Sequence, residues 1–558
     1  MLHKHSDTSL PEPMQNLNRG TLKLFLLMGP VLLATFLFSW SIFHSDLSKR
    51  EAREGVPVVN MMRGGNPWLP QINPEQLRTK PPLFYWSGLL SSKIFGGVDE
   101  VSLRIPSVIA GAGTVFLTAY LGMRQFTPVI GCIAGLIIAS CWRFAYLGSH
   151  ARIDMLFTFF ITLAFVAMWE LARIEKQRTS LKWLAGIAIG LAVLTKGPLG
   201  LLFPLFAIFF FSRAVKFDVP WLHLFLLPLS MAGLWLVFGL IDGGKEFATM
   251  IQQETLGRIT GNTSIQVHRK PFFYYLPQIF GGMAPWSLFL PFAIWYGIKD
   301  LRHNVPWKFC AIALATLFIF LSMFPGKRGD YLLPLYPMGA IILAIFFSQF
   351  GAANSGIKFS MLIPTWVIMG IMLILALLLV FGTLLPELNL DSYSAFINSR
   401  DRWMAQQLYH KHRPAALFLA AGALGMLIFS KYLREALYKK SGINLTGLLA
   451  GWALLLYLTV HGPAARVVNE YSSFRPFSEE IKKLSNGRPL FSRIKAREDL
   501  LYYLDLPVTD VNNEAPGPDA LIIMKKEHSS DWLKHYPDQK IILEMNASFE
   551  PYQLIGKP

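Results

Sequence analysis

Charged residues are scarce in this chain. Only 16% of its 558 residues are Asp, Glu, Lys or Arg, whereas 53% are hydrophobic, and the mean hydropathy is +0.40. A soluble globular protein carries about 25% charged residues. Apolar runs of about 20 residues, the length that crosses a bilayer, recur along most of the chain. This composition excludes an ordinary soluble domain and predicts a polytopic membrane protein.

Cysteine is nearly absent, and acidic residues are outnumbered by basic ones. Cys132, Cys141 and Cys310 all lie inside apolar runs, so they form neither a disulfide framework nor a metal-binding spacing. The formal net charge is +17. Because the basic residues lie in short clusters between apolar segments, their pattern favours contact with anionic membrane lipids and the positive-inside rule over nucleic-acid binding.

The hydropathy pattern predicts about thirteen membrane spans. They cover roughly residues 22–44, 101–122, 128–147, 153–172, 182–195, 198–212, 219–241, 283–298, 307–323, 330–349, 358–383, 412–430 and 443–462. The first is a retained signal anchor, because the polar tail before it carries no cleavage pattern. Short basic loops, such as 173–182 and 431–440, predict a cytoplasmic N-terminus, and an odd number of spans then places the C-terminus in the periplasm.

The predicted fold class is an all-α polytopic membrane protein with a small C-terminal α/β domain. Near the C-terminus, β-like runs at 520–524 and 540–544 follow a helix-like stretch at 478–484. We expect a transmembrane domain with periplasmic loops over residues 1–465 and a periplasmic domain over 466–558.

Charged residues on the predicted outer side are not explained by membrane orientation, since that rule places basic residues inside. They occur in six groups, at 49–54, 79–82, 150–154, 195–198, 254–270 and 325–331. Each group alone has a structural reading, as an amphipathic interfacial helix, a proline-stiffened or solvated turn, or a helix-end carboxylate. Their shared face favours one site, where basic side chains hold a phosphate and carboxylates orient or deprotonate an acceptor.

Eight short motifs, in order, resemble those of a known family. They are Arg50-Glu-Ala-Arg53, Asn66-Pro-Trp-Leu-Pro70, Lys80-Pro-Pro-Leu-Phe-Tyr-Trp86, Arg104-Ile-Pro106, Asp154 at the start of a span, Leu194-Thr-Lys-Gly197, Lys270-Pro-Phe-Phe-Tyr-Tyr275 with Pro285-Trp286, and Gly326-Lys-Arg328 with Tyr331-Leu-Leu-Pro334. Over residues 20–465 the chain resembles the GT-C membrane glycosyltransferases that use polyprenyl-phosphate sugars. The most similar are the bacterial 4-amino-4-deoxy-L-arabinose lipid A transferases and the protein O-mannosyltransferases.

This resemblance implies an activity and a set of site residues. The donor would be an undecaprenyl-phosphate-linked sugar, and the acceptor would be lipid A, another glycan or a protein at the periplasmic face of a bacterial inner membrane. The resemblance implies catalytic carboxylates at Glu51 and Asp154. The donor phosphate would be bound by Lys80, Arg53, Arg258 and Lys327, and the substrate by Tyr331, Lys196, His268 and Tyr85.

Two positions depart from the family pattern. Arg50 stands where the family usually carries Asp, so the resemblance assigns the carboxylate role to the next residue, Glu51. Thr79 stands where the lipid A transferases carry Glu, so a metal proposed there with His268 loses a ligand, and we expect no metal and no other cofactor.

A transporter or flippase for a lipid-linked glycan is the alternative function. Transporters usually place ionisable residues near the middle of their spans and often show internal repeats. Here the spans are nearly without acidic residues away from their ends, which favours an enzyme acting at the outer face.

Overall fold

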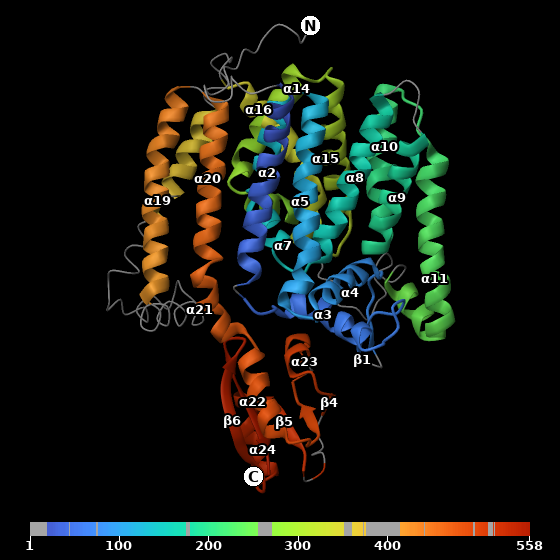
Figure 1. Ribbon diagram of the computed structural model, residues 1–558, viewed down its shortest axis with the longest axis vertical. Helices are drawn as coiled ribbons and strands as arrows, with labels where there is room; N and C mark the ends of the chain where they lie inside the picture. The colour runs from blue at the N-terminus through green and yellow to red at the C-terminus, as the bar shows by residue number, and fades with distance from the viewer. Residues whose placement is uncertain are drawn as a thin grey trace.

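The protein consists of an apolar helical bundle with a smaller α/β unit at one end (Figure 1). The computed structural model describes residues 19–43, 45–73, 76–173, 179–254, 270–350, 360–371, 373–374, 413–439, 441–494, 497–511, 517 and 519–557. Among these residues, eight helices are long and apolar enough to cross a membrane, or up to ten when each of two bent pairs counts as one span. The chain is a multi-pass membrane protein, as its composition predicts.

Long helices form most of the bundle. They are α2 (Arg19–Ile42), α5 (Glu100–Gln125), α8 (Ile153–Arg173), α9 (Thr179–Lys196), α10 (Leu199–Val215), α11 (Trp221–Gln252), α15 (Val305–Met323), α16 (Tyr336–Ser348), α19 (Arg413–Tyr438) and α20 (Gly442–Val460). Shorter elements connect them: α6 (Pro128–Ala139), α7 (Trp142–Gly148), η2 (Phe272–Tyr274), α13 (Tyr275–Gly282), η3 (Trp286–Phe289), α14 (Leu290–Asp300) and η4 (Gly329–Leu335).

Ten of the predicted spans coincide with the eight spanning helices or with the two bent pairs. The pairs are α6 with α7, bent by 72°, and 272–282 with 286–300, bent by 116°. The remaining predicted spans fall on α10, on the helical segment 360–371 and on α19. The first two are shorter than a full span within the described residues, so the number thirteen stays a prediction.

Four small elements close the end of the bundle that faces the α/β unit (Figure 1). They are α3 (Lys49–Met62), β1 (Gln71–Asn73), β2 (Gln76–Leu77) and α4 (Leu83–Phe95). The helix α3 carries Ala52, Val58 and Met61, which are buried in the main core. Burial of these residues fixes α3 against the bundle, whereas Lys49 and Arg50 in its first turn stay exposed.

The C-terminal unit is an α/β structure, as predicted. Its elements are α21 (Pro463–Ser472), α22 (Arg475–Ser485), β3 (Leu490–Ser492), α23 (Glu498–Leu504), β4 (Val508–Asp510), β5 (Leu521–Lys525), α24 (Lys526–His535), β6 (Lys540–Ala547) and β7 (Glu550–Gly556). The five strands lie in the order β4-β3-β5-β7-β6, with parallel pairs from β4 to β5 and antiparallel pairs from β5 to β6. The predicted runs fall on β5 and β6, and the predicted helix lies within α22. The domain boundary at residue 466 stays a prediction.

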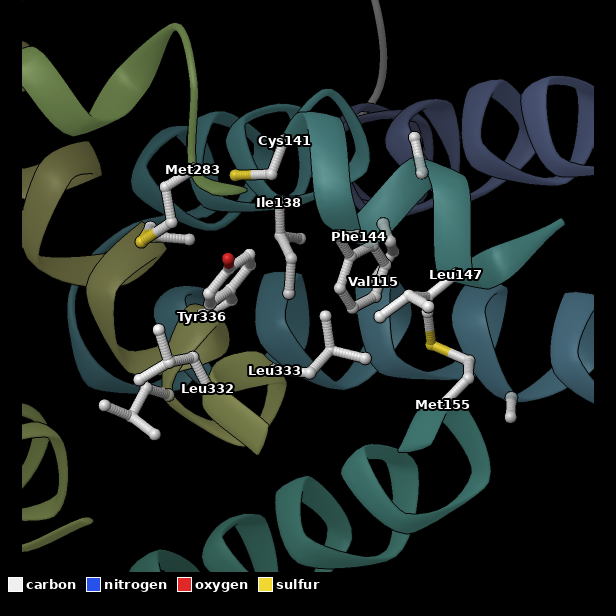
Figure 2. Packing of buried hydrophobic residues seen from close by; sticks show 14 of the residues in the cluster. Val115, Ile138, Cys141, Phe144, Leu147, Met155, Met283, Leu332, Leu333 and Tyr336 are labelled. Carbon is white, nitrogen blue, oxygen red and sulfur yellow. The ribbon is translucent and has the colours of Figure 1, made fainter. Parts of the chain in front are cut away.

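A continuous apolar core anchors the short helix η4 inside the bundle. Leu333 and Tyr336 are fully buried. Figure 2 shows both side chains in the same cluster as Ile138, from the bent pair α6–α7. The polar start of η4 is therefore held at a fixed position relative to α7, and this position matters for the site described next.

Candidate active site

Glu51 lies in a fully buried ion pair. Ser48 precedes α3, and its backbone N–H and hydroxyl donate to Oε2 of Glu51 at 3.0 and 2.9 Å. Arg104 on α5 donates from Nε to Oε1 at 2.8 Å and from Nη2 to Oε2 at 3.2 Å, and the backbone N–H of Ala151 donates to Oε1 at 3.1 Å. Burial opposes ionisation, but the charge of Arg104 and these hydrogen bonds outweigh it and hold the pKa of Glu51 well below its usual range. Both carboxylate oxygens are engaged inside the protein, and the catalytic role of Glu51 stays a prediction.

Arg104 also fixes the chain that leads into α3. Its Nη1 donates to the carbonyl oxygens of Ile42 and Ser45 at 2.9 and 2.7 Å, and its Nη2 donates to that of Asp46 at 3.0 Å. A guanidinium group has five N–H donors in a rigid plane, which suits several acceptors at once. Arg104 therefore sets the relative positions of the end of α2, the segment after it and α3.

A second buried carboxylate, Glu54, lies one turn further along α3. It accepts two hydrogen bonds of 2.8 Å from Nη2 of Arg78 and one of 2.8 Å from the hydroxyl of Tyr85, and Arg53 lies 3.5 Å away. Burial would raise the pKa of Glu54, but the charges of Arg78 and Arg53 hold it below the usual range. Tyr85, predicted to bind substrate, is thus placed in a buried network with Glu54.

Three predicted site residues meet at the ends of different helices. Asp154, in the first turn of α8, pairs with Lys196, the last residue of α9, at 2.5 Å between Oδ1 and Nζ. The same ammonium lies 4.3 Å from the ring centroid of Tyr331 in η4. A cation over an aromatic face is attracted by the ring electrons, so Tyr331 and Asp154 hold Lys196 from two sides.

Arg152 connects this ion pair to another carboxylate, Asp330 in η4. Nη2 of Arg152 lies 2.6 Å from Oδ2 of Asp330 and 3.7 Å from Oδ2 of Asp154. Asp330 also lies 3.9 Å from Nη1 of Arg50 and 3.9 Å from Nε of Arg143. The carboxylate of Asp330 thus lies near three arginines, and its negative charge offsets the repulsion between them.

A cavity of about 520 Å³ lies beside Asp330. It is lined by Lys49, Arg50, Arg53, Arg143, Lys270, Tyr274, Gln278, Lys327, Arg328, Gly329, Asp330 and Glu498. The side chain of Arg50 is 66% exposed at the rim, whereas Lys327 is 4% exposed at the floor. Seven basic and two acidic residues in one partly enclosed space create a positive potential that attracts an anion.

The side chain of Arg143 lies against the backbone of Gly329, which carries no side chain. Its Nη2 donates to Oε1 of Gln278 on α13 at 2.9 Å, and its Nη1 donates to the backbone carbonyl of Gln278 at 3.3 Å. A Cβ atom on Gly329 would lie 2.3 Å from Nη1 of Arg143 and 2.4 Å from Oε1 of Gln278. The ends of the Arg143 and Gln278 side chains therefore fill the space beside Gly329, and both would have to shift if a Cβ atom were added.

The four residues predicted to bind the donor phosphate do not all lie together. Arg53 and Lys327 line the cavity, and the ammonium of Lys327 also donates to two backbone carbonyl oxygens of neighbouring loops. Lys80 lies outside the cavity lining and forms an ion pair with Glu254, just after α11. Lys80 is also close enough to Tyr331 to act on its hydroxyl electrostatically. Arg258, like the predicted substrate-binding His268, lies outside the described residues.

Sequence reasoning did not select Arg143, Arg152 or Asp330. Arg152 and Asp330 lie within outer groups that the sequence singled out, at 150–154 and 325–331, so their location was indicated although their roles were not. Arg143 lies inside the predicted span 128–147, where an ionisable residue indicates a functional position. That signal could have found it.

Known proteins share this architecture and parts of this sequence. The family model described as dolichyl-phosphate-mannose-protein mannosyltransferase matches residues 57–239. A protein of Aquifex aeolicus is 30% identical over 378 residues, which cover 66% of this chain and 72% of that protein. The chain belongs to the GT-C family of membrane glycosyltransferases.

Other relatives are named for an activity. An undecaprenyl phosphate-alpha-4-amino-4-deoxy-L-arabinose arabinosyl transferase of Enterobacter sp. (strain 638) is 26% identical over 319 residues, covering 55% of this chain and 56% of that enzyme. The chain thus spans about half the length of the curated arabinosyl transferases that it matches. The crystal structure of ArnT from Cupriavidus metallidurans bound to undecaprenyl phosphate has a TM-score of 0.75 at 17% identity, covering 96% of this chain and 99% of that chain. This match establishes the GT-C fold over nearly the whole chain.

The residues present do not fit the metal that the GT-C resemblance suggests. Thr79 offers a neutral hydroxyl where a carboxylate ligand would be needed. Within the part of the chain that the structure describes, no three His, Cys, Asp or Glu side chains gather in a way that could hold an ion. The chemistry below is therefore built on side chains alone.

Proposed function

We propose that this chain transfers a sugar from a polyprenyl-phosphate donor of the undecaprenyl type to an acceptor at the periplasmic face of a bacterial inner membrane. The observation that carries the proposal is the connection, through Arg152 and Asp330, between the basic cavity and the Asp154–Lys196 pair. Positive charge that can receive a phosphate and a carboxylate that can orient an acceptor thus belong to one continuous site. The named relatives support the donor class.

The basic side chains would act on the leaving group. As the bond between C1 of the sugar and the phosphate oxygen breaks, its electron pair stays on the phosphate, where negative charge increases. Lys80, Arg53, Arg258 and Lys327 are proposed to neutralise this charge. Groups held in place before the reaction stabilise such a charge without the cost of reorganising solvent.

A carboxylate would act on the acceptor. The acceptor oxygen attacks C1 from the side opposite to the phosphate, so the configuration at C1 inverts. A hydroxyl acceptor must also lose its proton, and we propose Asp154 for this step because it lies at the junction with Lys196 and Tyr331. Glu51, enclosed by Arg104, is the second candidate. A phosphate acceptor arrives already ionised and needs orientation alone.

The proposed orientation follows from loop charges. Short basic loops place the N-terminus in the cytoplasm, and α3, α4 and the α/β unit share one end of the molecule (Figure 1), which is then periplasmic. The ionisable residues of the site lie at the ends of helices: Asp154 opens α8, Lys196 ends α9 and Asp330 lies at the start of η4. This placement favours an enzyme over the alternative, a transporter or flippase, whose ionisable residues would lie nearer the midplane.

The test uses purified protein in lipid vesicles with a polyprenyl-phosphate donor labelled in its sugar. We expect label to move to an acceptor while polyprenyl phosphate is released. Lys80→Ala and Asp154→Asn should each lower the rate roughly ten- to a hundredfold, which is the effect of losing about 1.5–3 kcal/mol of charge-assisted interaction. The control is Lys299→Ala in a predicted cytoplasmic loop, which should transfer at the wild-type rate. Movement of intact donor across the bilayer without transfer would refute the proposal in favour of a flippase.

A further inference from the structure

The helix α23 of the C-terminal unit docks beside α3 (Figure 1). The hydroxyl of Tyr503 accepts a hydrogen bond of 2.5 Å from the backbone N–H of Leu47 and donates one of 2.9 Å to Oε1 of Glu100, at the start of α5. Both partners belong to the end of the bundle. The position of α23 relative to the basic cavity is therefore fixed by specific bonds.

The first turn of α23 is also fixed within its own domain. Arg497 donates to both carboxylate oxygens of Asp499, at 3.0 and 2.7 Å, and to the hydroxyl of Ser548 at 2.9 Å. Glu498 lies between Arg497 and Asp499, so its backbone is held by neighbours on both sides. Its side chain lines the basic cavity.

Glu498 contributes a negative charge to the cavity rim. Its Oε2 lies 3.8 Å from Nζ of Lys49, and the side chains of Lys49 and Glu498 are 54% and 21% exposed. The second acid of the lining, Asp330, pairs with other basic residues, Arg152 and Arg143. Glu498 is therefore the acid that an anion meets when it approaches Lys49.

The charge of Glu498 opposes the anion that the cavity attracts. The Glu498 carboxylate forms an ion pair with Lys49, and it repels a phosphate that approaches this lysine. The repulsion grows with the charge of the ligand. A phosphodiester, as in a sugar–phosphate–polyprenyl donor, carries one negative charge, whereas a phosphate monoester carries about 1.5 to 2 near pH 7. Glu498 thus weakens binding of the monoester more than binding of the diester.

We propose that Glu498 is a specificity-determining residue, through which the C-terminal α/β unit lowers the affinity of the cavity for phosphate monoesters. The inference rests on the proposed function in one respect: the monoester is the polyprenyl phosphate left after sugar transfer. Glu498 then favours exchange of product for new donor. The C-terminal unit is part of the active site and does more than stabilise the fold.

Inorganic phosphate is the first probe, because its binding can be measured whether or not sugar is transferred. Titration calorimetry on the purified full chain in zwitterionic-lipid nanodiscs at low salt gives its Kd. We expect Glu498→Gln to lower this Kd roughly threefold, the size expected for one partly exposed ion pair. Glu498→Asp keeps the charge and should retain the wild-type Kd.

The matched control is Glu527→Gln. Glu527 also lies in the first turn of a helix of the same domain and pairs with a lysine, Lys525, at 3.5 Å, but it does not line the cavity. This variant should leave the Kd for phosphate unchanged. An unchanged or higher Kd in Glu498→Gln would overturn the inference, and so would an equal effect of Glu527→Gln.

The transfer assay supplies the second readout. In Glu498→Gln we expect the inhibition constant of added polyprenyl phosphate to fall roughly threefold and kcat to fall with it, while the KM for donor changes less. Unchanged product inhibition would count against the inference. If wild-type protein transfers no sugar but Glu498→Gln still binds inorganic phosphate more tightly, the proposed function fails and the role of Glu498 at the rim stands.

Discussion

Replacing Glu51 by Gln separates a structural role of this residue from a catalytic one. The carboxylate accepts hydrogen bonds from Ser48, Arg104 and Ala151, and both oxygens take part. An amide keeps one oxygen and turns its NH₂ group toward donors that previously met the other. It also leaves the guanidinium of Arg104 buried without its counter-ion. We therefore expect Glu51→Gln to destabilise the fold, and we expect loss of transfer to follow from that destabilisation.

The expected loss of stability in Glu51→Gln can be judged from the contacts of Glu51 and Arg104. Removing one partner of a buried ion pair costs about 3–5 kcal/mol. Arg104 keeps its three backbone carbonyl partners in the variant, which limits the cost. We expect the free energy of unfolding to fall by about 3 kcal/mol, at the lower end of that range.

Thermal unfolding of the purified variant in detergent, followed by tryptophan fluorescence, measures this change. The control is Glu480→Gln, which breaks the pair with Lys483; the two side chains are 40% and 68% exposed. This pair should contribute little to stability because solvent screens it. If Glu51→Gln unfolds at the wild-type temperature and still transfers no sugar, Glu51 acts in the chemistry and the structural reasoning is refuted.

Two further predictions concern the docking of α23 and the response to acid. Tyr503→Phe removes the hydroxyl that bonds to both Leu47 and Glu100, so we expect a lower kcat in the transfer assay. The control is Tyr502→Phe on the same helix, which should behave as wild type. Equal effects of the two substitutions would contradict a specific role of the Tyr503 hydrogen bonds. Burial opposes ionisation of Glu54, but neighbouring arginines hold its pKa below the usual value, so its stabilising effect is complete above about pH 4.3 and is lost as the pH falls through the lowered pKa. The unfolding temperature, measured from pH 7 to 3, should therefore fall less steeply in Glu54→Gln than in wild type, and parallel curves would contradict the assignment.

Much of the fold could be predicted from the sequence because the bilayer restricts the choices. Apolar segments that cross it must satisfy their backbone hydrogen bonds internally, so their length and composition predict helices. The bends between α6 and α7 and near residues 283–285 could not be predicted in this way. They divide continuous apolar runs, and their positions depend on packing against helices that are distant in sequence.

The candidate site was predictable in location but not in its pairings. Charges that orientation could not explain indicated one end of the molecule, and Asp154, Lys196 and Tyr331 meet there. The partners of Asp330 and Glu51 lie on other elements, tens of residues away or more. Hydrophobic periodicity predicts which face of a helix is buried, but it does not encode which charged side chains meet across helices.

The hydrogen atom on Cα of Gly329 sets a size limit for one wall of the cavity. Alanine, the smallest possible change, would place a methyl group 2.3 Å from Arg143 and 2.4 Å from Gln278, so both side chains would have to move. A shift of Arg143 would change its distance of 3.9 Å from Asp330, although neither charged residue had been altered. The spacing of the charged groups at this wall thus depends in part on a neutral position, because the ends of two side chains occupy the space that a Cβ atom would need.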